Sequence, residues 1–125
     1  MATQELNSDN FNSTIQENDI VIIDFWAQWC GPCKSFAPTF ETASESHTNI
    51  VFAKVNTEEQ TELAQACQIR SIPTLMIFRE QVLLFNQAGA LAPAQLEDVI
   101  DKVKELDMDE VRASLREEQK NNQEG

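Results

Sequence analysis

The stretch DFWAQWCGPCK, residues 24–34, places two cysteines, separated only by a glycine and a proline, directly after an apolar run. The run itself, DIVIIDFWA (residues 19–27), is β-branched and aromatic at successive positions, which is typical of a parallel strand that is buried on both faces. After the cysteines, apolar residues recur at helical spacing from Phe36 to Ala43, and Pro38 is expected to kink this helix. The stretch therefore predicts a buried strand, a turn that carries both cysteines, and a helix.

The rest of the chain continues this alternation of strands and helices. Further strands are predicted at residues 49–55, 74–78 and 82–85. A short helix is predicted around Phe11 and Ile15, with Ser8 or Asp9 as its cap. A second helix is predicted at residues 57–68, with Leu63, Ala66 and Cys67 on its apolar face. A third is predicted from Pro93 to Leu106. The last two strands are close enough to form a hairpin, although Arg79-Glu80-Gln81 lacks the glycine or asparagine that a tight turn prefers. The pattern indicates an α/β fold with a mixed sheet.

The composition limits the classes of function. A chain of 125 residues suits a single domain and buries enough surface to fold without disulfides. Its net charge of −12 disfavours nucleic acid as a partner, and no segment is apolar for long enough to span a membrane. The N-terminus is polar and has no basic residue before Lys34, unlike a secretory signal or a transit peptide, so we expect a cytoplasmic location. In a reducing cytosol, paired cysteines are more often catalytic or metal-binding than structural.

Cys30 and Cys33 are interpreted as a redox pair. At the start of a helix, unpaired backbone N–H groups and the helix dipole favour a thiolate at Cys30, and the thiolate is the nucleophile of disulfide exchange. Cys33 lies further into the helix, so it should be more buried and better suited to resolving a mixed disulfide. The alternative is a zinc site that also uses Cys67 and His47, but their spacing matches no standard zinc motif. His47 is instead interpreted as a surface residue.

Asp24 is a carboxylate within the apolar strand that precedes the cysteines. Burial should raise its pKa, so that it can accept a proton near neutral pH. The alternative interpretation is a structural carboxylate that is satisfied by hydrogen bonds.

Three motifs, FWAQWCGPCK (residues 25–34), SIPTL (71–75) and QAGAL (87–91), resemble the thioredoxin family in their order and separation. The likeness covers about residues 3–106. It implies the thioredoxin fold, a central five-stranded mixed sheet flanked by helices, and the reduction of protein disulfides. It also implies recycling by thioredoxin reductase, whose NADPH and FAD would supply the electrons. Because the sequence has no glycine-rich phosphate loop, NADPH and FAD are expected to bind to the reductase, and this chain is expected to bind no cofactor. We also expect a redox-active Cys30–Cys33 disulfide and a monomer.

The resemblance also implies roles for single residues. Cys30 corresponds to the attacking cysteine, Cys33 to the resolving one, and Asp24 to the buried aspartate that assists deprotonation of the resolving cysteine. Lys54 corresponds to a lysine near that aspartate; alternatively, it is an ordinary strand lysine whose charged end reaches water. Pro73 corresponds to a cis-proline that faces the disulfide. The substrate-binding residues implied by the family, here called the docking surface, are Trp29, Gly31, Pro32, Ile72, Pro73, Gly89 and Ala90.

Two members of the docking surface have a second interpretation, because Trp29 and Ile72 could simply pack in the core. The backbone of Ile72 is expected to pair with an extended substrate segment if Pro73 is cis. Ser71 and Gln81 stand where the family commonly has glycine, which puts the local geometry at both positions in doubt. Cys67 lies outside the active-site motif and is interpreted as a small hydrophobic residue, with an oxidation-sensitive thiol as the alternative.

Residues 107–125 continue past the usual end of the family. Asp107 is expected to cap a short helix with Met108, Val111 and Leu115 on one face, followed by disorder from about Lys120. We therefore predict a thioredoxin domain at residues 1–106 and a C-terminal extension at 107–125, for which docking to a partner is a hypothesis.

The leading functional interpretation is a general protein-disulfide reductase. The Gly-Pro dipeptide and the polar N-terminus favour reduction over a specialised oxidase or isomerase. An alternative from another class is a thioredoxin-like binding module. The intact Cys30, Cys33 and Asp24 argue against it, because a pure binding module does not need them.

Overall fold

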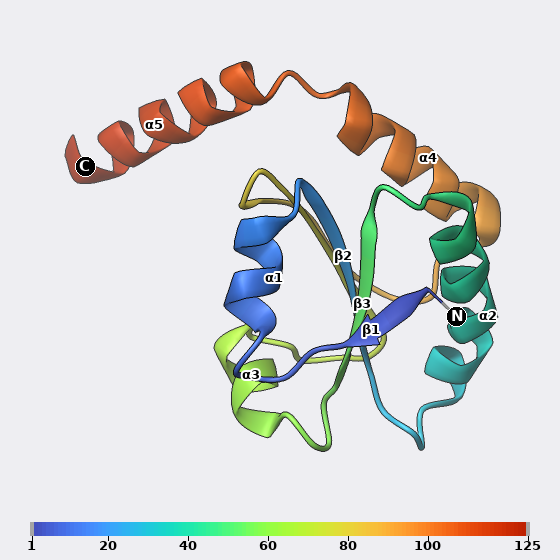
Figure 1. Cartoon of the computed structure of the whole chain (residues 1–125). Helices are drawn as coiled ribbons and strands as arrows, with labels where there is room; N and C mark the ends of the chain where they lie inside the picture. Colours follow the sequence, from blue (N-terminus) through green and yellow to red (C-terminus); the bar gives the residue numbers. More distant parts are fainter. Residues whose placement is uncertain (1, 125) are drawn as a thin grey trace.

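Helices and strands alternate along the chain in the computed structural model, which describes the backbone of residues 2–124 and the side chains of residues 2–120 (Figure 1). The strands are β1 (Thr3–Glu5), β2 (Ile20–Trp26), β3 (Val51–Asn56), β4 (Thr74–Arg79) and β5 (Val82–Ala88). The helices are α1 (Phe11–Glu17), α2 (Gly31–Ser46), α3 (Thr61–Ala66), α4 (Pro93–Glu105) and α5 (Met108–Glu124). The sequence pattern predicts all of the strands except β1, whose three polar residues show no apolar alternation.

The five strands form one mixed sheet in the order β1-β3-β2-β4-β5. β1, β3 and β2 are parallel, whereas β4 is antiparallel to β2 and β5 is antiparallel to β4. α2 and α4 cover one face of the sheet, and α1 and α3 cover the other (Figure 1). This is the helix-flanked mixed sheet that the resemblance implies.

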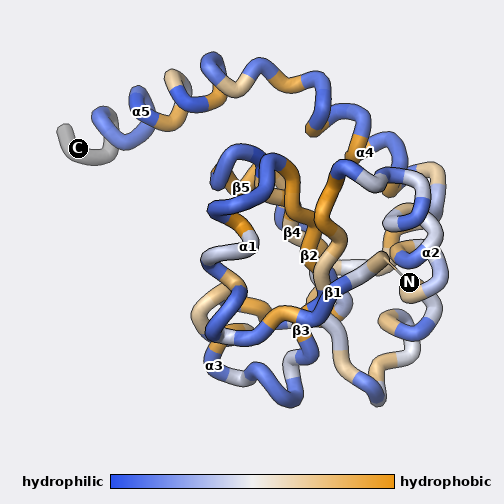
Figure 2. The backbone as a smooth tube through the Cα atoms, in the orientation of Figure 1, coloured by the Kyte–Doolittle hydropathy of each residue, from blue (hydrophilic) through white to orange (hydrophobic). Residues whose placement is uncertain are grey.

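β2 lies in the middle of the sheet and is apolar on both faces because both faces are covered. Ile20 and Ile22 pack with α2 and α4, whereas Val21, Ile23 and Phe25 pack with α1 and α3. Figure 2 shows hydrophobic residues concentrated in the central strands and hydrophilic residues along much of the helices. Burying each of these large side chains contributes about 1.5–3 kcal/mol, so β2 is a rigid base for the turn that follows it.

β4 and β5 form the predicted hairpin. Arg79 pairs with Val82, so the connection is the two-residue turn Glu80-Gln81. The φ angles of these two residues are 50° and 69°, which are the left-handed values of a turn usually made by glycine and asparagine. Because neither residue has that preference, the strand pairing on both sides sets the turn.

The helix predicted at residues 57–68 is shorter in the structure, because a turn occupies its predicted start. It ends before Gln68, whose φ of 57° lies in the left-handed region. Leu63 and Ala64 are its buried residues. Ala66 is exposed, so the predicted apolar face was wrong at that position.

The cap predicted for α1 was also wrong. Asn10, and not Ser8 or Asp9, is the residue that precedes the helix. Asn7 organises the turn before it, since its Oδ1 accepts the backbone N–H groups of Asp9 at 2.9 Å and Asn10 at 3.1 Å. The two apolar residues predicted for this helix are buried.

His47 is not the surface residue that the sequence predicts. It ends α2, and its side chain is only 13% exposed. Its Nε2 lies 2.7 Å from Glu97 Oε2, its Nδ1 lies 3.2 Å from Lys104 Nζ, and its ring stacks on Phe52. The contacts with α4 come from residues about 50 positions away in sequence, which a local pattern does not reveal.

α4 packs on the sheet through Leu96, Ile100 and Val103, as predicted. Leu106, predicted at the end of this apolar face, lies past the end of the helix and is 41% exposed. The guanidinium of Arg79 donates hydrogen bonds to the carbonyl groups of Val103 at 2.9 Å and Leu106 at 2.8 Å, which satisfies carbonyls at the helix C-terminus.

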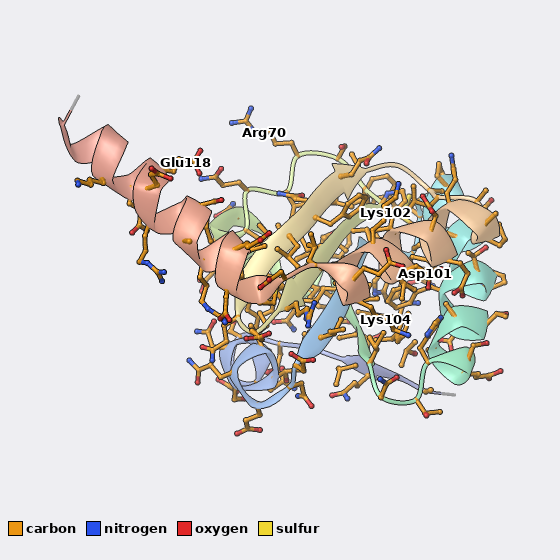
Figure 3. The ribbon with its side chains drawn as sticks, turned by 90° about the horizontal axis from the view of Figure 1, so that it is seen from above. Arg70, Asp101, Lys102, Lys104 and Glu118 are labelled. Carbon is orange, nitrogen blue, oxygen red and sulfur yellow. A yellow bond between two sulfur atoms is a disulfide. The ribbon has the colours of Figure 1, made fainter. Side chains whose placement is uncertain are left out.

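α5 is longer than the short helix that the sequence predicts, and its backbone is helical to Glu124, where disorder was predicted from about Lys120. It projects away from the sheet (Figures 1 and 3). Asp107 caps it as predicted, because its Oδ1 accepts the backbone N–H of Asp109 at 3.0 Å. Met108 is 4% exposed, whereas Leu115, further along the same face, is 39% exposed. The division into a domain at 1–106 and an extension at 107–125 remains a prediction. No helix within residues 2–124 combines the length and apolar character needed to cross a bilayer.

Candidate active site

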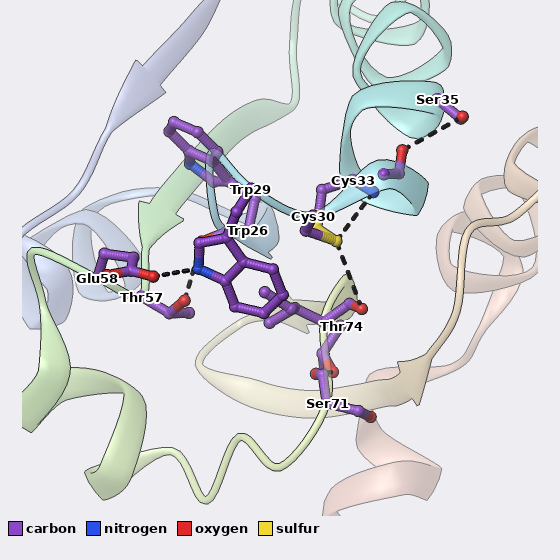
Figure 4. The surroundings of a disulfide bond; sticks show 11 residues. Trp26, Trp29, Cys30, Cys33, Ser35, Thr57, Glu58, Ser71 and Thr74 are labelled. Carbon is purple, nitrogen blue, oxygen red and sulfur yellow. Dashed lines mark hydrogen bonds between the residues drawn. A yellow bond between two sulfur atoms is a disulfide. The ribbon is translucent and has the colours of Figure 1, made fainter.

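Cys30 and Cys33 form a disulfide at the N-terminus of α2 (Figure 4). Their Cα atoms are 5.2 Å apart, and Cys30 is the residue that caps the helix. Pro32 lies in the first turn of the helix, where proline's lack of a backbone N–H costs no hydrogen bond because N–H groups there have no partner within the helix. Cys30 is 4% exposed and Cys33 is 3% exposed, so burial does not separate the two as the sequence analysis expects.

Hydrogen bonding does separate the two cysteines. The backbone N–H of Cys33 donates to Cys30 Sγ at 3.2 Å (Figure 4). When the disulfide is reduced, this N–H group and the helix N-terminus favour negative charge on the sulfur of Cys30. The backbone therefore supports a thiolate at Cys30.

The loop before β4 brings the second motif beside the disulfide. The Ile72–Pro73 peptide bond is cis, and the Ile72 carbonyl oxygen lies 3.7 Å from Cys30 Sγ. The Pro73 carbonyl in turn accepts a hydrogen bond from the backbone N–H of Gly89 at 2.8 Å. This bond links the third motif, QAGAL (residues 87–91), to the Pro73 loop. Gly89 has a φ of 111°, a conformation that other residues rarely adopt, so a glycine is required there.

The docking surface includes an exposed tryptophan. Trp29 is 68% exposed, so the interpretation that it packs in the core was wrong. Its indole N–H donates a hydrogen bond to Glu58, which follows β3 (Figure 4). Gly31 and Pro32 are also exposed, and Ile72 is half-buried against the cysteine pair.

Glu58 is not among the residues that were predicted from the sequence. One signal was present, because Glu58 follows the strand that is parallel to β2, and the carboxyl ends of neighbouring parallel strands meet at one edge of a sheet. Ala90 is exposed and follows Gly89 at the same edge. The structure thus gathers the predicted docking residues around the disulfide, with Glu58 as an additional contact.

Asp24 is buried, with 1% of its surface exposed. Neither carboxylate oxygen has a hydrogen-bond partner among the described residues, so no protein group supports the interpretation as a hydrogen-bonded structural carboxylate. Burial raises the pKa of Asp24 from 3.8 to about 7; the nearby Lys54 lowers it, and Glu5 raises it. A carboxylate with this pKa can exchange a proton near neutral pH.

The fold places Asp24 under the start of α2. Ile22, two residues earlier in β2, packs in the same core cluster as Phe36, which lies one helical turn after Cys33. Side chains two residues apart in a strand point to the same face, so Asp24 faces the helix turn that carries Cys33.

Lys54 lies beside Asp24 on the neighbouring strand, because the two residues are in register between β2 and β3. It is half-buried, and its Nζ lies 4.9 Å from the ring centroid of Trp26, a cation–π contact. Trp26 itself packs against the cluster of Ala27 and the two active-site cysteines, so it is a structural neighbour of the cysteine pair.

The potential zinc ligands are dispersed in the structure. Cys67 packs against the core cluster on the α1 and α3 face, whereas His47 lies between α2 and α4 on the opposite face. No group of three or more His, Cys, Asp or Glu side chains that could hold a metal ion occurs within the part of the chain that the structure describes.

Cys67 should react slowly with iodoacetamide in the native protein. It is half-buried against the core, and burial raises the pKa of its thiol, which reduces the thiolate fraction. We expect alkylation at least about tenfold slower than in denaturant. Mass spectrometry of the oxidised protein measures this directly, since Cys30 and Cys33 are then blocked. Equal rates in the two conditions would instead support an oxidation-sensitive thiol.

Comparison with known proteins gives a consistent match. The Thioredoxin family model matches residues 2–102. A Streptomyces coelicolor protein assigned as thioredoxin 2 is 57% identical over 118 residues, covering 94% of this chain and 88% of that protein. Thioredoxin C-3 of Corynebacterium nephridii is 40% identical over 99 residues, covering 78% of this chain and 68% of that protein.

Solved structures share the fold. A mutant thioredoxin from Halobacterium salinarum superposes with a TM-score of 0.77 at 31% identity, covering 84% of this chain and 93% of that one. Plasmodium falciparum thioredoxin superposes with a TM-score of 0.74 at 35% identity, covering 79% and 97%. The helix-flanked five-stranded sheet is therefore the thioredoxin fold.

The Streptomyces match also includes part of α5. The match to the family model ends at residue 102. The Streptomyces match covers 94% of the chain, so it must extend past Met108, where α5 begins. The Corynebacterium match covers 78% of the chain. A C-terminal segment of this kind is thus present in at least one relative.

Proposed function

The chain belongs to the thioredoxin family and is a protein thiol-disulfide reductase that works through its Cys30–Cys33 pair, and from this premise we propose that Cys30 attacks the substrate and Cys33 resolves the mixed disulfide. The observation that carries this assignment is the hydrogen bond from the Cys33 backbone N–H to Cys30 Sγ. It stabilises a thiolate on Cys30 and offers no equivalent support to Cys33.

The exchange takes two steps. The Cys30 thiolate attacks one sulfur of the substrate disulfide, forming a Cys30–substrate disulfide and releasing the other substrate sulfur as a thiolate. Cys33 then loses its proton and attacks Cys30 Sγ, which forms the Cys30–Cys33 disulfide and releases the second substrate thiolate. Two electrons pass from the dithiol to the substrate.

Asp24 accepts the proton that Cys33 loses in the second step. Its burial below α2 and its pKa of about 7 suit this role, because the carboxylate can take up a proton at neutral pH and return it to solvent. Lys54 acts as a positioning residue, since its charge opposes the protonation of Asp24.

The docking surface holds the substrate beside Cys30. Trp29 offers an exposed aromatic face, and the backbone of Ile72 can pair with an extended substrate segment. The carbonyl of Ile72 lies 3.7 Å from Cys30 Sγ, so a segment paired there would bring its own disulfide to the attacking sulfur.

The partners follow from this chemistry. Disulfide-containing proteins are the substrates, and thioredoxin reductase, with NADPH and FAD, returns two electrons to the Cys30–Cys33 disulfide. We place this monomeric reductase in the cytoplasm, where a reducing pool of this kind operates. A specialised oxidase or isomerase and a pure binding module are the alternatives.

The test is insulin-disulfide reduction coupled to NADPH oxidation by a thioredoxin reductase. The intact protein should turn over repeatedly, and the matched variant Cys67→Ser, which removes the cysteine outside the motif, should turn over at the same rate. Absence of turnover in the intact protein would favour the binding module. Turnover by the intact protein but not by Cys67→Ser would place Cys67 in the path of the electrons.

A further inference from the structure

Asp24, Lys54 and Glu5 occupy neighbouring positions on three adjacent strands. Asp24 of β2 is in register with Lys54 of β3, and Lys54 is in register with Glu5 of β1. Paired residues point to the same face of a sheet. For β1 this is the α2 face, because Thr3, two residues before Glu5, donates a hydrogen bond to Glu41 of α2 at 2.7 Å. The three side chains therefore form a row with one lysine between two carboxylates.

Lys54 forms an ion pair with neither carboxylate. Within the described side chains, no carboxylate oxygen lies within ion-pairing distance of Lys54 Nζ, which instead lies over Trp26. Asp24 is buried without a hydrogen-bond partner among the described residues, whereas Glu5 is exposed. The electrostatic effect of Lys54 is thus divided between a buried and an exposed carboxylate.

A solvent-facing cavity opens beside this row, and its lining includes Glu5, Trp26 and Glu59. Partial burial chiefly raises the pKa of Glu5, the charge of Lys54 lowers it, and the charge of the nearby exposed Glu59 raises it. Glu5 therefore belongs to the electrostatic surroundings of Lys54 and does not act as an isolated surface charge.

The groups that face Asp24 come from every element around it. β4 contributes the apolar Leu75, which is paired with Asp24. The titratable or charged groups are Lys54 from β3, Glu5 from β1, and the Cys33 thiol of α2 when the disulfide is reduced. Glu59, from the segment after β3, acts on Glu5.

We propose that Glu5 is a positioning residue that influences proton exchange at Asp24 by competing with Asp24 for the charge of Lys54. The proposal rests on the proposed role of Asp24 as the proton acceptor for Cys33. When Glu5 is ionised, it attracts the lysine ammonium, and it also repels negative charge on Asp24. Both effects favour the protonated form of Asp24, in the same direction that Glu5 shifts its pKa.

The test is an NMR titration of the Asp24 carboxyl carbon in the oxidised protein. Adjacent strands lie about 4.8 Å apart, so Glu5 and Asp24 are about 10 Å apart, and Glu5→Gln should lower the pKa of Asp24 by about 0.3 to 1. The matched control is Glu17→Gln, which removes the same charge from an exposed position at the end of α1 and should leave the titration of Asp24 unchanged.

Two further measurements test the electrostatic route. In about 1 M salt, the difference between Glu5→Gln and the parent should largely disappear, because Glu5 is exposed and the screening length falls to about 3 Å. In a Lys54→Met background, Glu5→Gln should shift the titration of Asp24 by less than it does with Lys54 present.

Equal titrations of Asp24 in the two glutamine variants would overturn the proposal, as would an undiminished effect of Glu5→Gln in the Lys54→Met background. These outcomes are separate from a failure of the proposed function. If Asp24→Asn reduces insulin at the parent rate, the proton-acceptor role fails, while the titration still reports whether Glu5 acts on Asp24.

Discussion

Replacing Cys30 with serine should reduce insulin-disulfide reduction to the rate measured without the protein. A serine hydroxyl is not ionised at neutral pH, and Cys33 lacks the backbone hydrogen bond that supports a thiolate on Cys30. We expect a loss of at least about 10³-fold, as for the removal of an enzyme nucleophile. NADPH oxidation coupled through a thioredoxin reductase measures it, with Cys67→Ser as the cysteine-to-serine control.

The Cys33→Ser variant should behave differently from Cys30→Ser. Its Cys30 can still attack, but no second thiol releases the product, so one mixed disulfide per molecule should accumulate. Mass spectrometry after incubation with a disulfide substrate should locate the bond at Cys30. Accumulation of a mixed disulfide at Cys33 in Cys30→Ser, at the rate expected for Cys33→Ser, would reverse the two roles.

Asp24→Asn should remove a large pH dependence of stability. The pKa of Asp24 is raised from 3.8 to about 7 by burial, so between these pH values the folded protein holds a proton that the unfolded chain has lost. The stabilisation from the protonated form is complete below about pH 4 and is lost as the pH rises to about 7. A pKa difference of about 3 corresponds to about 4 kcal/mol.

Chemical denaturation of the oxidised protein measures this effect. The free energy of unfolding of the parent, relative to Asp24→Asn, should fall by about 4 kcal/mol between pH 4 and pH 8. Asp101→Asn makes the same chemical change at an exposed residue of α4 and should show no such dependence relative to the parent. A constant difference between parent and Asp24→Asn at all pH values would mean that Asp24 titrates normally.

The features predicted correctly from the sequence depend on local information. The two cysteines follow a run that is apolar on both faces and precede helical periodicity, so the strand–turn–helix unit is predictable without knowing its neighbours. Asp24 could be recognised because a carboxylate within that run must be buried when both faces of β2 are covered. The cis peptide bond before Pro73 was an expectation from the resemblance alone, and the structure contains it.

The errors concern residues whose surroundings come from distant segments. Core packing, the second interpretation of Trp29, was wrong, because its side chain is 68% exposed and is hydrogen-bonded to Glu58, 29 residues away. His47 reads as a surface residue but is held by Glu97 and Lys104 of α4. In each case the side chain's partners are set by how elements pack together, which spacing along the chain does not specify.

The redox chemistry of this protein is already specified by the local sequence, because CGPC at the start of a helix supplies both thiols and the backbone N–H groups that favour a thiolate. The surroundings of the two thiols depend on how the chain folds. Strand register aligned Glu5, Lys54 and Asp24 in one row, and the cis-proline loop placed the Ile72 carbonyl beside Cys30. Register and loop position depend on packing across the whole sheet, whereas the cysteine pair depends on four consecutive residues.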